Sequence, residues 1–147
     1  MSAIRVSFQR YEADVVLPDY ATAGAAGMDI AAYIDTPVTL KPFERAAIPT
    51  GFAMQLPHGY EAQIRPRSGL ALKNGVTVAN APGTIDSDFR GEIAVILINL
   101  SQHRFTIRSG MRIAQLVVAP IVRCFRQEQS QLDMSDRGDG GFGSTGL

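Results

Sequence analysis

The segment Ala46-Ala-Ile-Pro-Thr-Gly-Phe-Ala-Met-Gln-Leu-Pro-His-Gly-Tyr-Glu-Ala-Gln-Ile-Arg65 decides the fold class of this 147-residue chain. Two stretches rich in apolar residues, Ala46–Leu56 and Tyr60–Arg65, flank Pro57-His58-Gly59. Proline and glycine this close together are typical of a turn. The segment therefore predicts two β-strands joined by a turn.

The same alternation of short apolar stretches and turn residues continues in both directions along the chain. Further strands are expected at Ile4–Phe8, Met28–Ile34, Thr36–Leu40, Glu92–Leu100, Phe105–Ile107 and Arg112–Ile121. Of these, Glu92–Leu100 is almost continuously apolar, which predicts a buried strand. Many short strands with frequent turns predict an all-β sandwich, jelly roll or small barrel.

One short helix is expected at Gly69–Lys73. Ser68 can cap its first turn through the hydroxyl oxygen, and Gly75 follows its last turn, where glycine tolerates a positive φ.

Composition excludes several classes of protein. Fourteen basic and fourteen acidic residues give a net charge of zero, which argues against broad binding of nucleic acid or anionic membranes. A single cysteine, Cys124, excludes an intrachain disulfide, and His58 and His103 have no partner at metal-ligand spacing. The longest apolar run, Ile93–Ile98, is too short to span a membrane, and the N-terminus has no signal pattern. We expect a cytoplasmic protein.

The C-terminal residues differ from the rest in composition. Residues 127–147 contain few large apolar side chains, among them Leu132, Met134 and Phe142, and five of the fourteen glycines fall in the last eleven residues. Such a segment cannot build its own core. We therefore expect one domain at residues 1–126 and an arm at residues 127–147.

Two local patterns in the domain suggest chemistry, although each also has an ordinary structural explanation. Asp86 and Asp88 lie between Gly83 and Gly91, where they could hold water or a divalent cation, or simply populate a turn. The apolar Ile85 beside Asp86 suggests that this carboxylate is partly buried.

The predicted helix start, with Arg67 and Ser68, could bind an anion or be only a capped turn.

The arm suggests a flexible clamp. Arg137, Ser144 and Thr145 can donate to phosphate oxygens, and Phe142 offers a flat face to a base. The alternative is a tail without a ligand.

Together these segments resemble the trimeric deoxyuridine 5′-triphosphate nucleotidohydrolase (dUTPase) family. Five motifs occur in the family's order: Ala26-Gly-Met-Asp-Ile30, Pro66-Arg-Ser-Gly-Leu70, Gly83-Thr-Ile-Asp-Ser-Asp-Phe-Arg-Gly-Glu92, Gly110-Met-Arg-Ile-Ala-Gln-Leu116 and Arg137-Gly-Asp-Gly-Gly-Phe-Gly-Ser-Thr-Gly146. The resemblance implies a jelly-roll-like β-barrel and a homotrimer with shared active sites, in which the arm of one subunit closes the site of a neighbour. It also implies hydrolysis of dUTP to dUMP and pyrophosphate, which limits uracil in DNA and supplies dUMP for thymidylate synthesis.

The resemblance further implies roles for individual residues. Asp86 would be the general base for the water that attacks the α-phosphorus, and Ser68 would stabilise the bridging oxygen that departs. The cofactor would be Mg²⁺, held by the substrate phosphates and by waters that Asp29 braces, with no direct side-chain ligand. The other residues implied in substrate binding are Arg67, Gly69, Asn80, Thr84, Ile85, Phe89, Gln115, Arg137, Phe142, Gly143, Ser144 and Thr145.

Within this set the expected contacts differ. Arg67 and Gln115 would contact the chain of phosphates, whereas Arg137 and Thr145 would contact the γ-phosphate.

The uracil edge would be read by Asn80 and by backbone groups up to Asp86, with Phe142 stacked on the ring. At position 89 the chain has Phe where the family usually has Tyr, and this ring would pack beneath the sugar.

Two rival functions remain open from the sequence. One is a dCTP deaminase with a related trimeric barrel, which uses a Glu general base. The other is a regulator that binds nucleotide without turnover. The Pro66–Leu70 motif and the arm favour the hydrolase over the deaminase, and the presence of Asp86, Ser68 and Arg137 argues against the regulator.

Overall fold

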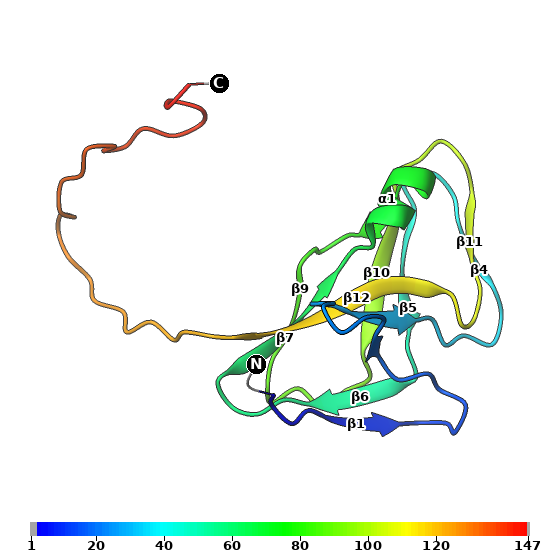
Figure 1. The fold of residues 1–147 in the computed structure, drawn as a ribbon. Helices are drawn as coiled ribbons and strands as arrows, with labels where there is room; N and C mark the ends of the chain where they lie inside the picture. The colour runs from blue at the N-terminus through cyan, green and yellow to red at the C-terminus, as the bar shows by residue number, and fades with distance from the viewer. Residues whose placement is uncertain (1–2, 147) are drawn as a thin grey trace.

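The computed structural model describes residues 3–146. The predicted domain begins at Met1 and Ser2 and the predicted arm ends at Leu147, and these three residues lie outside the described residues. The described chain is mostly β with one short helix (Figure 1). Its elements are β1 (Ser7–Arg10), β2 (Asp19–Tyr20), β3 (Met28–Ala31), β4 (Val38–Leu40), β5 (Arg45–Pro49), β6 (Phe52–Gln55), β7 (Tyr60–Arg65), α1 (Ser68–Asn74), β8 (Val76–Val78), β9 (Gly83–Ile85), β10 (Ala94–Asn99), β11 (Phe105–Ile107) and β12 (Arg112–Pro120).

The strands form one five-stranded sheet, in the order β2-β3-β12-β7-β9, and three smaller sheets. The smaller sheets have the orders β5-β10-β8, β1-β6 and β11-β4. All strand pairs are antiparallel. Alternate residues of these strands face one common core, whose largest fully buried apolar side chains are Phe52, Ile30, Ile48, Leu97, Ile107, Ile113, Leu116, Val76 and Val95.

The predicted strand Tyr60–Arg65 is confirmed at both ends, but the predicted strand Ala46–Leu56 is two strands, β5 and β6. The break falls at Gly51, which has a φ of +74° and has no room for a Cβ atom, since one would come within 2.6 Å of Val15. Because both strands are apolar on either side of this break, the pattern of hydrophobic residues gave no sign of it.

The apolar run Glu92–Leu100 forms β10, but the expectation that this strand is buried is only half right. Val95 and Leu97 are fully buried, whereas Ile96 on the opposite face is 36% exposed. The strand therefore packs one face on the core.

The helix is confirmed, with one correction. Arg67 is the N-cap residue and no side chain caps the first turn, so Ser68 is the first helical residue and not the cap. Gly75 ends the helix with a φ of 64°, and its N–H bonds to the carbonyls of Ala71 and Leu70, as expected of a C-terminal glycine.

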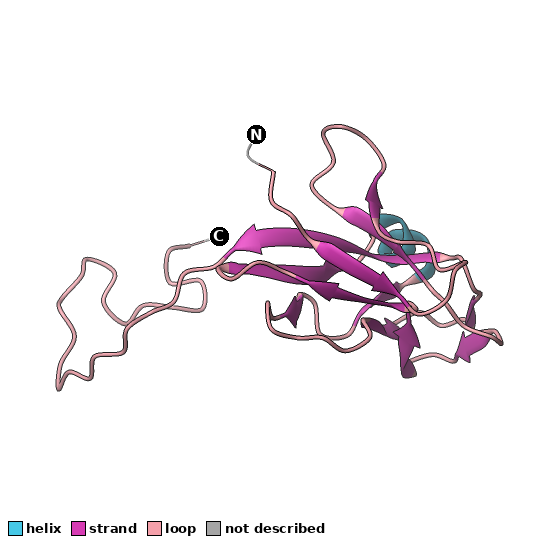
Figure 2. Ribbon diagram, turned by 90° about the horizontal axis from the view of Figure 1, so that it is seen from below, coloured by secondary structure: helices cyan, strands magenta, loops and turns pink. Residues whose placement is uncertain are grey.

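Residues 121–146 form no helix or strand, and they curve away from the β-sheets as one long loop (Figures 1 and 2). The N–H of Ile121 still bonds to the carbonyl of Gly59 at 2.9 Å, whereas the hydrogen bonds further along stay within the arm, for example from the N–H of Gly140 to the carbonyl of Arg137. Cys124 is exposed in this segment. Among the described residues, no helix is long and apolar enough to cross a membrane.

Candidate active site

Side chains from two neighbouring strands, β3 and β12, and from the start of α1 meet around Asp29. We call Asp29, Arg67, Arg112 and Gln115 the Asp29 cluster. One carboxylate oxygen of Asp29 lies 3.2 Å from Nε of Arg67, and the other lies 3.0 Å from Nη1 of Arg112. Arg67 also donates to the backbone carbonyl of Arg112 at 3.3 Å. The carboxylate therefore holds two guanidinium groups side by side.

Strand register explains why these residues meet. β12 lies between β3 and β7, and its residue Gln115 is opposite Asp29 on one side and Arg65 on the other. The amide nitrogen of Gln115 donates to the carbonyl of Pro66 at 3.0 Å. Gly27 leaves room for this side chain, because a Cβ atom at position 27 would lie 2.3 Å from the Gln115 amide oxygen. Gln115 is thus fixed beside the segment that leads into α1.

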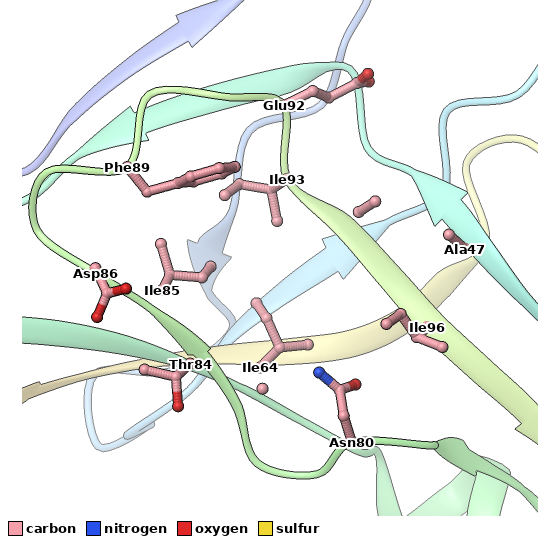
Figure 3. A pocket seen from close by; sticks show the side chains of 12 residues that line it. Ala47, Ile64, Asn80, Thr84, Ile85, Asp86, Phe89, Glu92, Ile93 and Ile96 are labelled. Carbon is pink, nitrogen blue, oxygen red and sulfur yellow. The ribbon is translucent and has the colours of Figure 1, made fainter.

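A second group of predicted residues lines a cleft of about 340 Å³ beside β9, which we call the Asp86 cleft (Figure 3). Asn80 lies at one end of this cleft, and Asp86 and Phe89 lie at the other. The lining residues are Ala47, Ile64, Asn80, Gly83, Thr84, Ile85, Asp86, Phe89, Glu92, Ile93, Ala94 and Ile96. An apolar lining with a few polar groups suits a flat, partly polar ring.

Two glycines shape this cleft. A Cβ atom at Gly83 would lie 3.3 Å from the Asn80 amide, and one at Gly91 would lie 2.6 Å from the Phe89 ring. The missing side chains therefore let Asn80 and Phe89 approach the backbone closely.

The Asp86 carboxylate is exposed, which corrects the expectation that it is partly buried. Ile85 beside it is buried, but β9 alternates, so that the side chain of Asp86 points outward. Within residues 3–146 the Asp86 carboxylate has no hydrogen-bonding partner. Its oxygens can accept hydrogen bonds from water.

The structure does not bring the predicted residues of the arm to either group. Arg137 donates only to the carbonyl of Gly140, at 2.8 Å, and Phe142 is fully exposed. Gly143, Ser144 and Thr145 likewise lie in the part of the arm that curves away from the sheets (Figure 1).

The predicted site residues of the single chain therefore fall into three groups. Asp29, Arg67 and Gln115 form the first, together with Ser68 and Gly69 at the adjoining start of α1. The second group lines the Asp86 cleft and consists of Asn80, Thr84, Ile85, Asp86 and Phe89. The third group is the arm.

Sequence reasoning missed Arg112. It lies within the motif Gly110–Leu116, but no position was assigned to it beside Asp29.

A second cleft, of about 240 Å³, is lined by none of the predicted site residues, and its lining includes Asp14 and Tyr33. The Tyr33 hydroxyl donates to the Asp14 carboxylate at 2.8 Å, and this hydrogen bond raises the pKa of Tyr33 above its ordinary value.

Asp29 is the carboxylate whose partners bear on metal binding. Among the described residues, no group of three or more His, Cys, Asp or Glu side chains is placed to hold a metal ion. Asp29 gives one oxygen to each of two arginines, yet each carboxylate oxygen can accept a further hydrogen bond from water. Asp29 could therefore bind a metal ion through a water molecule. Mg²⁺ commonly retains several of its waters in such sites.

A mostly β fold with two guanidinium groups held on one carboxylate, and a cleft beside the edge strand β9, suits an enzyme that binds a small anionic molecule. The chain belongs to the dUTPase family, whose family model matches residues 13–146.

Individual proteins agree with this assignment. The chain is 55% identical to the deoxyuridine 5′-triphosphate nucleotidohydrolase of Caulobacter vibrioides, over 99% of this chain and 97% of the relative. It is 54% identical to the protein of the same name from a Hydrogenobaculum species, over 98% and 99% of the two chains.

Among solved structures, the dUTPase of Staphylococcus bacteriophage 80alpha with dUPNHPP has a TM-score of 0.88 and 25% identity, and the match covers 99% of this chain and 100% of that one. A point mutant of the dUTPase from phage phi11 of S. aureus, whose structure is described with a structural Mg(II) ion, has a TM-score of 0.79 and 21% identity over 89% of this chain and 100% of that one.

Proposed function

We propose that this chain hydrolyses dUTP to dUMP and pyrophosphate, by attack of water on the α-phosphorus. The observation that carries this proposal is identity of 55% over almost the whole chain to a deoxyuridine 5′-triphosphate nucleotidohydrolase. In addition, every motif residue that the chemistry requires is present in this sequence.

Asp86 is the general base in this proposal. Its exposed carboxylate takes a proton from water while the oxygen bonds to phosphorus, and such a placed base accelerates a reaction by roughly 10²–10⁴-fold. Ser68 stabilises the oxygen that bridges the α- and β-phosphates, where negative charge grows as pyrophosphate departs. Arg67 and Gln115, already fixed by Asp29 and Pro66, contact the phosphates.

The Asp86 cleft binds uracil and deoxyribose. Asn80 and the backbone of β9 read the edge of the base, and cytosine would leave buried polar groups without partners there. Phe89 lies beneath the sugar, and Phe142 of the arm covers the base.

The site is shared between subunits of a jelly-roll-like barrel trimer. In the pairing of β7 with β9, Ile85 lies opposite Ala62, which places Asp86 next to Glu61. Ser68 lies beyond the other end of β7, and the distance from Glu61 to Arg65 is already roughly 13 Å at ~3.3 Å per residue.

Asp86 and Ser68 of the same chain are therefore too far apart to act on one phosphorus atom. Asp86 of one subunit would therefore act with Ser68 of another. The arm (residues 127–147), whose described residues curve away from the chain's own sheets, would close the site of a neighbour.

Mg²⁺ is the proposed cofactor. Asp29 would hold it through water, and the ion would supply positive charge to the three phosphates when bound.

The test is a panel of nucleoside triphosphates with Mg²⁺, assayed for pyrophosphate. We expect release from dUTP and little from dCTP, UTP or dTTP. Formation of dUTP from dCTP would instead indicate the deaminase, and binding of dUTP without pyrophosphate release would indicate the regulator.

A further inference from the structure

We propose that Arg112 is a phosphate-binding residue of this site, held beside Arg67 by Asp29. The inference rests on the proposed function, because it assigns one more residue to the same phosphate chain.

The main observation is an irregularity in β12. Arg112 pairs with Ala31 of β3, but Ala114 pairs with Ile30, so that Ile113 is an extra residue that forms a β-bulge. Ile113 and Ala114 are consecutive, yet both are buried, which a regular strand does not allow.

The bulge changes the direction of one side chain. Arg112 and Gln115 are three residues apart, and in a regular strand they would point to opposite faces of the sheet. With the bulge, both lie on the face that carries Asp29. Bulges next to active sites often redirect a side chain in this way.

Stability alone does not account for this arrangement. The Arg112 side chain is 60% exposed, and ion pairs this exposed contribute little to folding. A guanidinium has five N–H donors, and Asp29 accepts from only one nitrogen of Arg112, at 3.0 Å. The other donors remain accessible to a ligand.

Phosphate is the ligand chemistry that fits these donors. The planar fork of arginine matches two phosphate oxygens at once, and the guanidinium of Arg67 lies on the other oxygen of the same Asp29 carboxylate. Asp19, which lies opposite Asp29 in the β2–β3 pairing, accepts the backbone N–H of Tyr20 and forms no ion pair with either arginine within the described residues.

The test compares the full-length protein with its Arg112→Gln variant in binding two ligands without metal, in EDTA. One ligand is the α,β-imido analogue of dUTP, followed by calorimetry, and the other is deoxyuridine, which has no phosphate, followed by NMR. Arg104→Gln is the matched control, because it removes the same charge from an exposed arginine in the turn before β11.

We expect Arg112→Gln to weaken binding of the analogue by about tenfold or more, as loss of a charged hydrogen bond does. Binding of deoxyuridine and the midpoint of thermal unfolding should match those of the control. Unchanged affinity for the analogue, or equal losses for both ligands, would overturn the proposal. If Arg112→Gln does not fold, Arg112→Lys replaces it, with an expected loss of a fewfold for the analogue only.

Failure of the proposed function is a separate result. It would appear as absence of dUTP hydrolysis by the unmodified protein, whereas failure of this inference would leave that hydrolysis intact.

Discussion

In the Asp29 cluster the polar side chains hold one another, whereas in the arm they contact only the arm's own backbone. Arg67 and Arg112 share one carboxylate within 3.2 Å, but among residues 3–146 the Arg137 side chain has only the Gly140 carbonyl as a hydrogen-bonding partner. Groups that are fixed before a ligand arrives cost nothing further to order, whereas ordering a free backbone costs roughly 1–2 kcal/mol per residue. The β-sheets are thus suited to binding and chemistry, and the arm to closing the site once ligand is present.

The strongest test of this contrast removes the proposed base from the sheets. Asp86→Asn keeps the size of the side chain but cannot accept the proton of water. We expect turnover of dUTP to fall by roughly 10²–10⁴-fold, while affinity for the imido analogue changes only a fewfold. Steady-state kinetics and calorimetry measure the two quantities.

Asp88→Asn is the matched control, since Asp88 is an exposed carboxylate in the same turn. A near-normal rate for Asp86→Asn, or an equal loss for Asp88→Asn, would show that the base lies elsewhere.

Deletion of residues 137–147 tests the other side of the contrast. The described part of this segment, residues 137–146, forms no hydrogen bond to the sheets, so the midpoint of thermal unfolding should stay within a few degrees of that of the full chain. Turnover should fall by about 100-fold, because phosphate donors of this kind each contribute roughly 10²–10³ in rate. Replacement by a Gly-Ser segment of the same length should give the same loss. Unfolding of the truncated chain would mean that the arm is a structural element.

A single side chain of the arm should have a smaller effect. Phe142→Ala removes a fully exposed ring whose proposed role is to cover the base. Stacking of an aromatic ring on a base is worth about 1–3 kcal/mol, which corresponds to a loss of roughly 5- to 150-fold in kcat/KM for dUTP. Met134→Ala, at another fully exposed apolar position of the arm, should have little effect. Equal losses for the two variants would contradict a specific role for Phe142.

Local sequence patterns predicted much of this molecule because many of its elements are set by neighbouring residues. The turn at Pro57-His58-Gly59 and the C-terminal Gly75 mark their elements correctly. The short strands β2, β8 and β9 were missed, since two or three residues are too few to show a period.

The parts that local patterns could not predict depend on distant partners. At the break, Gly51 lies where a Cβ atom would collide with Val15, and the bulge at Ile113 shows only in the register with β3. Arg112 was not predicted as a site residue, because only the register shows that it lies on the same face of the sheet as Gln115. The separation of Asp86 from Ser68 likewise follows from the pairing of β7 with β9 and from nothing in either motif.

The smallest expected effect concerns Phe89. Like the Asp29 cluster, and unlike the arm, its ring is already held in place, against Gly91. A ribose 2′-hydroxyl placed against this ring would lose its water without gaining a partner, at a cost of about 1–3 kcal/mol. UTP should therefore be hydrolysed roughly 5- to 150-fold less efficiently than dUTP, as measured by kcat/KM for each. Phe89→Tyr should change kcat/KM for dUTP only about twofold, since a net hydrogen bond at an exposed position lies near the low end of ~0.5–1.5 kcal/mol. Phe89→Ala, which removes the ring, should bring the two substrates closer together. Comparable efficiency of the unmodified protein on UTP and dUTP would mean that a prepositioned ring is not enough, and that sugar selection needs either the missing phenolic hydroxyl or the closed arm.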